Sequence, residues 1–329
     1  MALFPADKEN MLDVLVKFPE QCKKASILGK NIKINTPDFI FVCGMGGSGI
    51  SGDILKAYLG SMMKMPPVIV VKDYTLPYYA TRNSLVFAVS YSGNTEETLS
   101  CFRSALAKQC NMIAISSGGK LKQLCAASAV PFIHIPEGLQ PRNAFGYLFI
   151  PMLNVLATNN IMPSQQDAIS RMTLALNNKA IFEKAKELSE KLVNKIPIIY
   201  SSEKLSVVAY RWKCEFNENS KIMAFNHTFS ELNHNEIVGY TNLKADFFVI
   251  MIEDESDIPK IKKRMDITKR LIIEKGVPCL TLKMTGNDLL TRIFNAMYLG
   301  DITSYFLAMK YGIDPTPVKI VEDLKKNLS

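Results

Sequence analysis

The sequence lacks long hydrophobic runs. Its longest apolar segments have the length of β-strands, and none could span a bilayer. No secretory signal peptide is recognisable, so we expect a cytoplasmic protein without a membrane partner. Histidine is scarce, with three residues at positions 134, 227 and 234. Because no cysteine cluster lies between His227 and His234, we expect no zinc site and assign no metal.

Cysteine pairs with a recognisable spacing are also missing. The chain has seven cysteines, an odd number, and no two of them have C-x-x-C spacing. This pattern is typical of reduced cysteines in a cytosolic protein.

The charge is only moderately unbalanced, with 39 Lys and Arg against 31 Asp and Glu and a net charge of +8. This excess of positive charge suits anionic ligands but does not identify them. The densest basic segment, residues 260–270, has Ile261, Met265 and Ile267 at roughly helical spacing, which predicts a surface helix. Its basic residues are not interleaved with aromatics and no nucleic-acid motif accompanies them, so we expect no nucleic-acid partner.

The first half of the chain alternates short apolar runs with helical patterns. The runs do not alternate with polar residues, as expected for strands covered by helices on both faces. The candidate strands are residues 39–43, 68–71, 85–90, 112–115 and 132–135, and the candidate helices are 51–59, 95–108, 120–127 and 144–157. A helical pattern over residues 5–28 precedes them. This order predicts a doubly wound parallel sheet.

The second half repeats this organisation after a polar connection, residues 158–180. The expected strands are 196–200, 222–225, 247–252 and 279–282, and the expected helices are 182–194, 204–215, 259–275, 288–311 and 317–328. At 329 residues the chain is long enough for two domains. We therefore predict two tandem α/β domains with doubly wound parallel sheets, residues 1–157 and 181–329. A ligand cleft is expected at the carboxyl ends of the strands.

The loop after the first strand is rich in glycine. Gly44 to Gly49 match G-x-G-x-x-G, and Asp73 ends the next apolar run, as in dinucleotide-binding folds. Glycines let the backbone approach an anion closely, and the following helix directs free N–H groups at it. The motif alone also fits a different phosphate or a purely structural turn.

The loop after the third strand carries three hydroxyls, those of Ser90, Ser92 and Thr95, and Gly93 lets the chain turn into the next helix. Hydroxyls and helix N–H groups together form a cradle for a phosphate monoester. Thr95 can also act as an N-cap, since Thr95 and Thr98 lie close to a capping-box pattern. The two serine hydroxyls are not needed for capping.

These two loops, "GGSG" and "SYSGNTEET", resemble those of the sugar isomerase (SIS) domain. Four further stretches, "PRNAFGY", "KCEFNENSK", "ELNHNEIVG" and "DPTPVKIVEDLK", resemble the bifunctional phosphoglucose/phosphomannose isomerases of archaea and some bacteria. The resemblance implies a homodimer with no cofactor. It also implies interconversion of glucose 6-phosphate and mannose 6-phosphate with fructose 6-phosphate through a cis-enediol. Asp73 then belongs to the family pattern and does not mark a ribose.

The resemblance also implies roles for individual residues. The expected substrate-binding residues are Gly46, Gly47, Ser48, Ser90, Ser92 and Thr95. Glu218 is the expected base and His234 the ring-opening residue, reaching the site from the neighbouring subunit. Arg142 would stabilise the enediolate, although Asn143 stands where the family commonly has alanine.

The resemblance also implies roles for two residues of the C-terminal segment. Lys325 would be another cation over the sugar, with Lys326 beside it as the competing choice. Thr316 would leave room for both epimers at C2.

Simpler interpretations exist for each of these residues. Glu218 could be a surface residue at a helix end, Arg142 an exposed loop residue, and His234 a side chain bonded within its own turn. His134 is expected to be structural. For the whole chain the alternatives are a non-catalytic phosphosugar-binding regulator and a nicotinamide-dependent dehydrogenase. The presence of both Glu218 and His234 speaks against the regulator.

Overall fold

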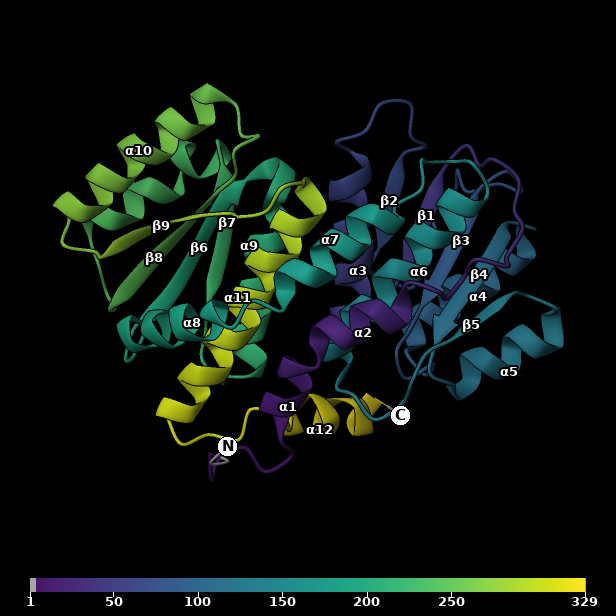
Figure 1. Cartoon of the computed structure of the whole chain (residues 1–329), viewed down its shortest axis with the longest axis horizontal. Helices are drawn as coiled ribbons and strands as arrows, with labels where there is room; N and C mark the ends of the chain where they lie inside the picture. The colour runs from purple at the N-terminus through teal and green to yellow at the C-terminus, as the bar shows by residue number, and fades with distance from the viewer. Residues whose placement is uncertain (1–3, 329) are drawn as a thin grey trace. The chain divides into compact units, whose positions relative to one another are not determined.

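The computed structural model describes residues 4–328, which form two compact units. The N-terminal unit comprises residues 17–174. The C-terminal unit comprises the described residues from 175 onward together with residues 4–16. Each unit is built around its own parallel sheet (Figure 1).

The sheet of the N-terminal unit has five parallel strands in the order β2-β1-β3-β4-β5. The central strands β1 and β3 are buried along their whole length, as a sheet covered on both faces requires. The strands are β1 (Ile40–Cys43), β2 (Val68–Val71), β3 (Leu85–Val89), β4 (Asn111–Ser116) and β5 (Phe132–His134). This arrangement confirms the predicted doubly wound parallel sheet.

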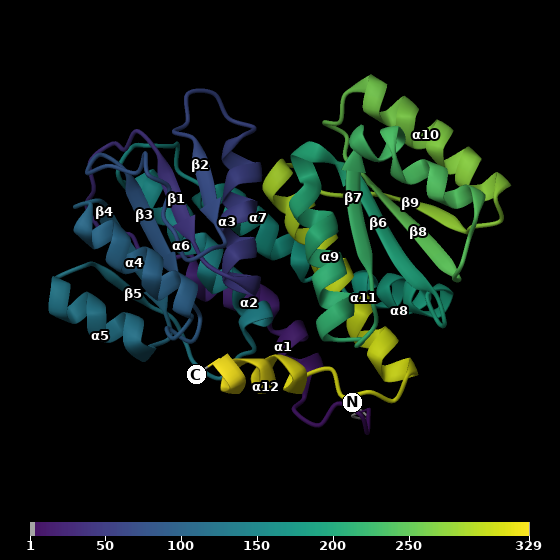
Figure 2. The ribbon, with the colours of Figure 1, turned by 180° about the vertical axis from the view of Figure 1, so that it is seen from behind.

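Helices cover both faces of this sheet. Helices α4 and α5 lie on one face, in front of the strands in Figure 2, and α3 and α6 lie on the other. The helices of this unit are α2 (Phe18–Ala25), α3 (Gly46–Leu59), α4 (Glu96–Ala107), α5 (Gly119–Ser128) and α6 (Phe145–Thr158); α7 (Gln166–Leu176) leads into the C-terminal unit.

The C-terminal unit has four parallel strands in the order β7-β6-β8-β9. They are β6 (Ile196–Ser202), β7 (Phe225–Phe229), β8 (Phe247–Glu253) and β9 (Cys279–Lys283). Helix α10 covers one face, and α8, α9 and α11 pack together on the other (Figure 1). The helices are α1 (Met11–Val16), α8 (Ala180–Lys191), α9 (Ser206–Glu218), α10 (Pro259–Glu274), α11 (Leu289–Lys310) and α12 (Lys319–Leu328).

The strand expected at residues 222–225 is wrong. Strand β7 begins at Phe225, which pairs with Ile198 of β6, and runs on to Phe229. It is an edge strand, and its polar residues Asn226, His227 and Thr228 are only partly buried, so hydrophobicity did not reveal it. Before it, Lys221 has a positive φ of 57°, and Asn217 Nδ2 donates to the Ile222 carbonyl oxygen.

Two helical segments also differ from expectation. The pattern over residues 5–28 is interrupted at Lys17, the N-cap of α2, and Pro19 stands in the first turn of that helix, where its missing N–H is tolerated. Helix α1 before the break belongs to the C-terminal unit, where Met11 and Leu15 pack on Tyr305. The polar stretch 158–180, expected as a connection, contains helix α7. The exact domain bounds stay a prediction.

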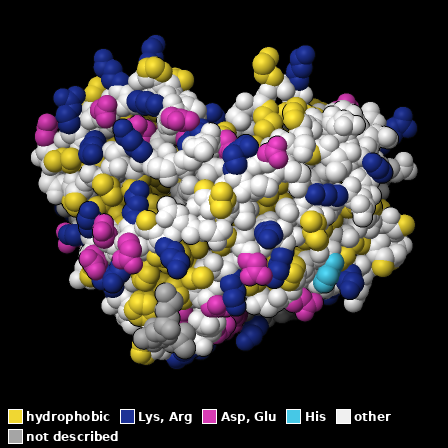
Figure 3. Space-filling model, in the orientation of Figure 1, with side chains coloured by type: hydrophobic (Ala, Val, Ile, Leu, Met, Phe, Trp, Pro, Cys, Tyr) yellow, Lys and Arg dark blue, Asp and Glu magenta, His cyan; other side chains and the backbone are white. Residues whose placement is uncertain are grey.

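The surface helix predicted from the basic segment is present as α10, which buries Met265, Thr268 and Ile272. On the face seen in Figure 3, the Lys and Arg side chains are interspersed with Asp and Glu and do not gather into one large patch among the residues described there. Within residues 4–328, none of the helices is both long and apolar enough to cross a membrane.

Candidate functional site

The predicted phosphate-binding loops lie side by side at one edge of the N-terminal sheet. One loop follows β1 and the other follows β3, and these strands are neighbours. From β1 the chain runs outward to β2, whereas from β3 it runs the other way to β4 and β5. The carboxyl ends of β1 and β3 are therefore the topological switch point, where open α/β sheets bind ligands.

A hydrogen bond joins the two loops directly. The backbone N–H of Tyr91 donates to Ser48 Oγ at 3.2 Å. In the second loop Ser90 Oγ and Thr95 Oγ1 are 2.8 Å apart, and the Gly93 N–H donates to Ser90 Oγ. Ser90 and Thr95 thus form one bonded pair of hydroxyls, and the Tyr91 N–H ties the Ser48 hydroxyl to the backbone of the same loop.

The capping interpretation of Thr95 is only half right. Thr95 is the N-cap of α4 with extended backbone angles, but its side chain makes no capping hydrogen bond. Its hydroxyl is directed at Ser90 instead. The fourth hydroxyl, that of Ser92, lies on an exposed residue and accepts from the Asn94 N–H at 3.3 Å. Thr95 therefore leaves the first-turn N–H groups of α4 uncapped by its side chain.

A third loop, after β4, locks the second one in place. Gly93 has a φ of +71°, and a Cβ there would lie 1.9 Å from the Gly118 carbonyl oxygen. Ser117 Oγ donates to the Tyr91 carbonyl oxygen at 2.7 Å. Sequence reasoning missed this support, although the "SSGG" stretch after a predicted strand was a usable signal.

Tyr91 connects the serine loop to the chain that leads to Arg142. Its hydroxyl donates to the Pro136 carbonyl oxygen at 3.0 Å and accepts from the Leu139 N–H at 2.8 Å. Burial raises the pKa of this phenol, so it stays protonated and able to donate. Its side-chain role was also missed, because these partners become neighbours only in the folded chain.

Arg142 is buried, with 2% of its surface exposed, so it is not an exposed loop residue. It lies in a 3₁₀ turn, Pro141–Ala144, whose backbone contacts the first turn of α3. A Cβ on Gly47 would lie 2.7 Å from the Pro141 carbonyl oxygen and 3.0 Å from Arg142 Cα. Gly47 therefore permits the approach of Arg142, whereas Gly46, with a φ of +52°, faces open space.

Glu218 is the last residue of α9 and is half-buried. The residues around it are fixed. Asn219 Nδ2 donates to Ser304 Oγ at 2.9 Å, and Ser220 Oγ donates to the Ser304 carbonyl oxygen at 2.7 Å. Two turns earlier on the same helix, the buried guanidinium of Arg211 forms a bidentate pair with Asp301 at 2.9 and 2.7 Å. The "NEN" segment therefore presents Glu218 from a rigid helix end.

The segment that contains Thr316 lies beside Glu218. The ammonium group of Lys221 donates to the backbone carbonyl of Glu218, and also to that of Pro315 at 2.9 Å. Thr316 is buried, with 4% exposure, and its N–H donates to Asp314 Oδ1. Residues 315–316 and the end of α9 are thus neighbours within the C-terminal unit.

His234 lies elsewhere in the C-terminal unit and is exposed. It ends a 3₁₀ turn, Glu231–His234, that follows β7. Its side chain has no hydrogen bond or ion pair with the other residues that the structure describes, which speaks against a role confined to its own turn. His134 on β5 is exposed beside the Phe132 ring, 6.3 Å away between centroids.

Lys325 and Lys326 are both exposed on α12. Lys325 follows Val321 by four residues and so borders the apolar side of this helix, which carries Ile320 and Leu324. Lys326 follows Glu322 by four residues and lies toward the charged side. If the apolar side of α12 packs against another surface, Lys325 therefore lies closer to that surface than Lys326 does. This favours Lys325 as the site residue.

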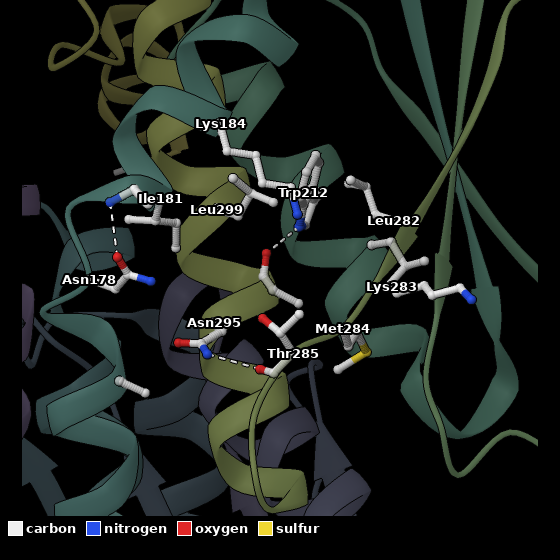
Figure 4. Close-up of a pocket in the computed structure, with 14 residues that line it drawn as sticks. Asn178, Ile181, Lys184, Trp212, Leu282, Lys283, Met284, Thr285, Asn295 and Leu299 are labelled. Atoms are coloured by element: carbon white, nitrogen blue, oxygen red, sulfur yellow. Dashed lines mark hydrogen bonds between the residues drawn. The ribbon is translucent and has the colours of Figure 1, made fainter.

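A pocket of about 200 Å³ occurs in the C-terminal unit, apart from the predicted residues (Figure 4). Its wall includes Trp212, whose Nε1 donates to the Ala296 carbonyl oxygen at 2.8 Å. Gly300 lets α11 pass this ring, since a Cβ there would be 2.6 Å from it. None of the predicted site residues lines the pocket, and Trp212 serves packing there. Among residues 4–328, no group of three His, Cys, Asp or Glu side chains is placed to hold a metal ion.

Comparison with known proteins gives matches over nearly the whole chain. A model of the SIS domain matches residues 33–132, and a model of the bacterial phosphoglucose isomerase C-terminal SIS domain matches residues 182–328. A bifunctional phosphoglucose/phosphomannose isomerase from Caldicellulosiruptor bescii is 43% identical over 97% of this chain and 99% of its own. One from Aquifex aeolicus is 39% identical over 88% of this chain and 90% of its own.

The fold has counterparts among solved structures as well. The C-terminal domain of glucosamine-fructose-6-phosphate aminotransferase from Francisella tularensis aligns with a TM-score of 0.75 at 15% identity, covering 96% of this chain and all of that one. This likeness supports the tandem SIS architecture and, at such low identity, nothing beyond the fold.

Proposed function

The chain belongs to the bifunctional phosphoglucose/phosphomannose isomerase family, and we propose that it interconverts glucose 6-phosphate and mannose 6-phosphate with fructose 6-phosphate through a cis-enediol. The observation that carries this proposal is the hydroxyls of Ser48, Ser90 and Thr95 at the switch point of the N-terminal sheet, where Ser90 bonds to Thr95 and the Tyr91 N–H of the same loop bonds to Ser48. The family membership favours an isomerase over the dehydrogenase that the first loop alone left open.

The phosphate group would be held in the N-terminal unit. Hydroxyls of Ser48, Ser90, Ser92 and Thr95 and the uncapped N–H groups at the start of α4 supply donors for its oxygens. These contacts anchor the sugar at its 6-position and thereby fix where C1 and C2 lie. Gly46, exposed beside the loop, leaves room for the sugar.

At the corresponding edge of the C-terminal sheet, charged side chains of the protein pair with one another. Asp254 follows β8 as Ser90 follows β3, and its buried carboxylate accepts from Arg292 Nε at 2.6 Å. Arg292 also pairs with Glu255 at 2.7 Å. Although burial alone would raise it, the pKa of Asp254 is lowered by the bonds from Arg292 and Ser256, so the carboxylate stays charged. Asp254 and Glu255 together outweigh the single positive charge of Arg292, so this group disfavours a phosphate, which supports one phosphate site per chain.

The chemistry needs a base near C1 and C2. We assign this role to Glu218, whose carboxylate would take the C2 proton of an aldose and return it at C1. Arg142 would stabilise the negative oxygen of the enediolate, and a buried guanidinium acts strongly there because water is excluded. Lys325 would add a second positive charge.

Ring opening needs a group that both takes and gives a proton near neutral pH, which suits histidine. We assign it to His234, whose exposed side chain fits a residue that completes the site of a neighbouring subunit in a homodimer. Mixing inactive Glu218→Gln and His234→Ala chains should then restore some activity through heterodimers. Persistent inactivity after verified subunit exchange would contradict the shared site.

The activity itself is tested by supplying glucose 6-phosphate or mannose 6-phosphate to enzyme treated with EDTA and following fructose 6-phosphate. We expect turnover of both sugars, because both give the same planar enediol once the C2 proton has left. Activity on glucose 6-phosphate alone would reduce the proposal to a single-function isomerase. Mannose activity that disappears with the chelator and returns with metal would overturn the metal-independent route.

A further inference from the structure

The segment that carries His234, residues 229–241, is tied to the rest of the C-terminal unit on both sides of the histidine. Before it, Asn233 Nδ2 donates to Thr268 Oγ1 of α10 at 2.8 Å. After it, Glu236 accepts from Tyr200 of β6. Within the segment, the side chain of Asn235 accepts from the Glu236 N–H and donates to Glu231 Oε1 at 2.9 Å. His234, which lies between these bonded residues, is exposed.

Hydrogen bonds also connect this segment to β6, a central strand of the sheet. Tyr200, fully buried on β6, donates its hydroxyl proton to Glu236 Oε1 at 2.6 Å, and its oxygen lies 2.7 Å from the hydroxyl of Tyr240. Glu236 and Tyr240 are four residues apart in one 3₁₀ segment, so they hold the Tyr200 hydroxyl from two positions. Glu236 lies two residues after His234.

Packing alone does not require this hydroxyl. The Tyr200 ring stands edge-on to Phe229 at 6.1 Å and belongs to the core cluster with Leu232 and Tyr240. Phenylalanine would fill the same space without a buried polar atom that must be satisfied. Burial raises the pKa of Tyr200, which keeps the phenol protonated as a donor.

We propose that Tyr200 and Glu236 are positioning residues for His234: their hydrogen bond sets the orientation of residues 229–241 and so the place where the imidazole meets a sugar ring. The inference rests on the proposed role of His234 in ring opening. Neither residue needs to touch the substrate. A shift of about 1 Å at the imidazole would be enough to slow the proton transfer by roughly a hundredfold.

The test measures ring opening separately from isomerisation. Exchange NMR follows the enzyme-catalysed interconversion of the α and β anomers of fructose 6-phosphate, in a Glu218→Gln background so that isomerisation does not compete. In this background we expect Tyr200→Phe to lower the anomerisation rate by about tenfold or more, with fructose 6-phosphate affinity changed less than about twofold. Glu236→Gln, which keeps an acceptor oxygen, should retain most of the rate, whereas Glu236→Ala should not.

A matched control exists in the same unit. Tyr305 is also buried, and its hydroxyl donates to Asp7 Oδ2 at 3.0 Å, far along the chain from residues 229–241. Tyr305→Phe should lower the melting temperature without changing anomerisation. If Tyr200→Phe behaves in the same way, the positioning role is overturned and the hydroxyl serves stability alone.

A double-mutant cycle with His234→Ala separates this inference from the proposed function. If Tyr200 acts through His234, Tyr200→Phe should not lower the anomerisation rate any further in the His234→Ala background. If Tyr200→Phe lowers the anomerisation rate by the same factor with and without His234, the inference is overturned while the role of His234 stays intact. Unchanged anomerisation in His234→Ala itself would refute the proposed ring-opening role, and the inference with it.

Discussion

Gly47 lies against the backbone of Arg142, so close that a methyl group on Gly47 would stand 2.7 Å from the Pro141 carbonyl oxygen. The contact joins the two parts of the N-terminal unit with different proposed tasks. Gly47 and Ser48 belong to the loop that is proposed to bind the phosphate, whereas Arg142 is proposed to act on the enediolate. The backbone position of Arg142 thus depends on the loop that is proposed to anchor the substrate.

Gly47→Ala should therefore damage catalysis through Arg142. The clashing atoms belong to the backbone and cannot turn aside as a flexible side chain could, so the 3₁₀ turn must move. We expect kcat to fall by about tenfold or more, together with a lower melting temperature. Arg142→Gln should lower kcat without the loss of stability that the clash causes. Ser61→Ala, two residues beyond the C-terminal end of α3, provides the control and should leave kcat unchanged.

The bonded hydroxyls of Ser90 and Thr95 predict a specific defect in substrate binding. Ser90→Ala and Thr95→Val each remove one donor to a charged phosphate, an interaction worth about 1.5–3 kcal/mol. The dissociation constant for fructose 6-phosphate, measured by titration calorimetry, should rise by roughly tenfold or more for each variant. Ser104→Ala, farther along the same helix α4, should bind normally. Normal affinity in the two loop variants would show that this loop does not bind the phosphate.

The place of Thr316 beside the end of α9 predicts control over the range of substrates. Thr316→Leu would fill space next to Glu218, and we expect it to lower the kcat/KM for mannose 6-phosphate at least about tenfold more than that for glucose 6-phosphate. Thr316→Val keeps the size and should retain both activities. Equal losses on the two sugars would show that Thr316 does not select between the epimers.

Much of this fold could be predicted from the sequence, because buried strands of a parallel sheet are short apolar runs and their helices have a clear period. Strand β7 was misplaced since an edge strand tolerates Asn226, His227 and Thr228 at its centre. Helix α7 was missed in a polar stretch, and nothing in the periodicity of residues 5–28 shows that α1 and α2 join different units.

The candidate site was predicted less completely. The sequence indicated that serine and threonine hydroxyls meet at the carboxyl ends of β1 and β3, and the hydrogen bond from the Tyr91 N–H to Ser48 agrees with this. It did not indicate that the Tyr91 side chain or Ser117 holds the loop, since these contacts join residues far apart in the chain. The roles of Glu218, His234, Arg142 and Lys325 stay predictions.

The central claim is that Glu218 moves the proton between C1 and C2, and Glu218→Gln tests it most directly. The amide keeps the shape of the side chain and removes the base. We expect isomerisation to fall by a factor of about 10² to 10⁴, with fructose 6-phosphate affinity nearly unchanged. Glu190→Gln, an exposed residue paired with Lys310 in the same unit, should retain full activity. More than a few per cent of wild-type isomerisation in Glu218→Gln would contradict the account.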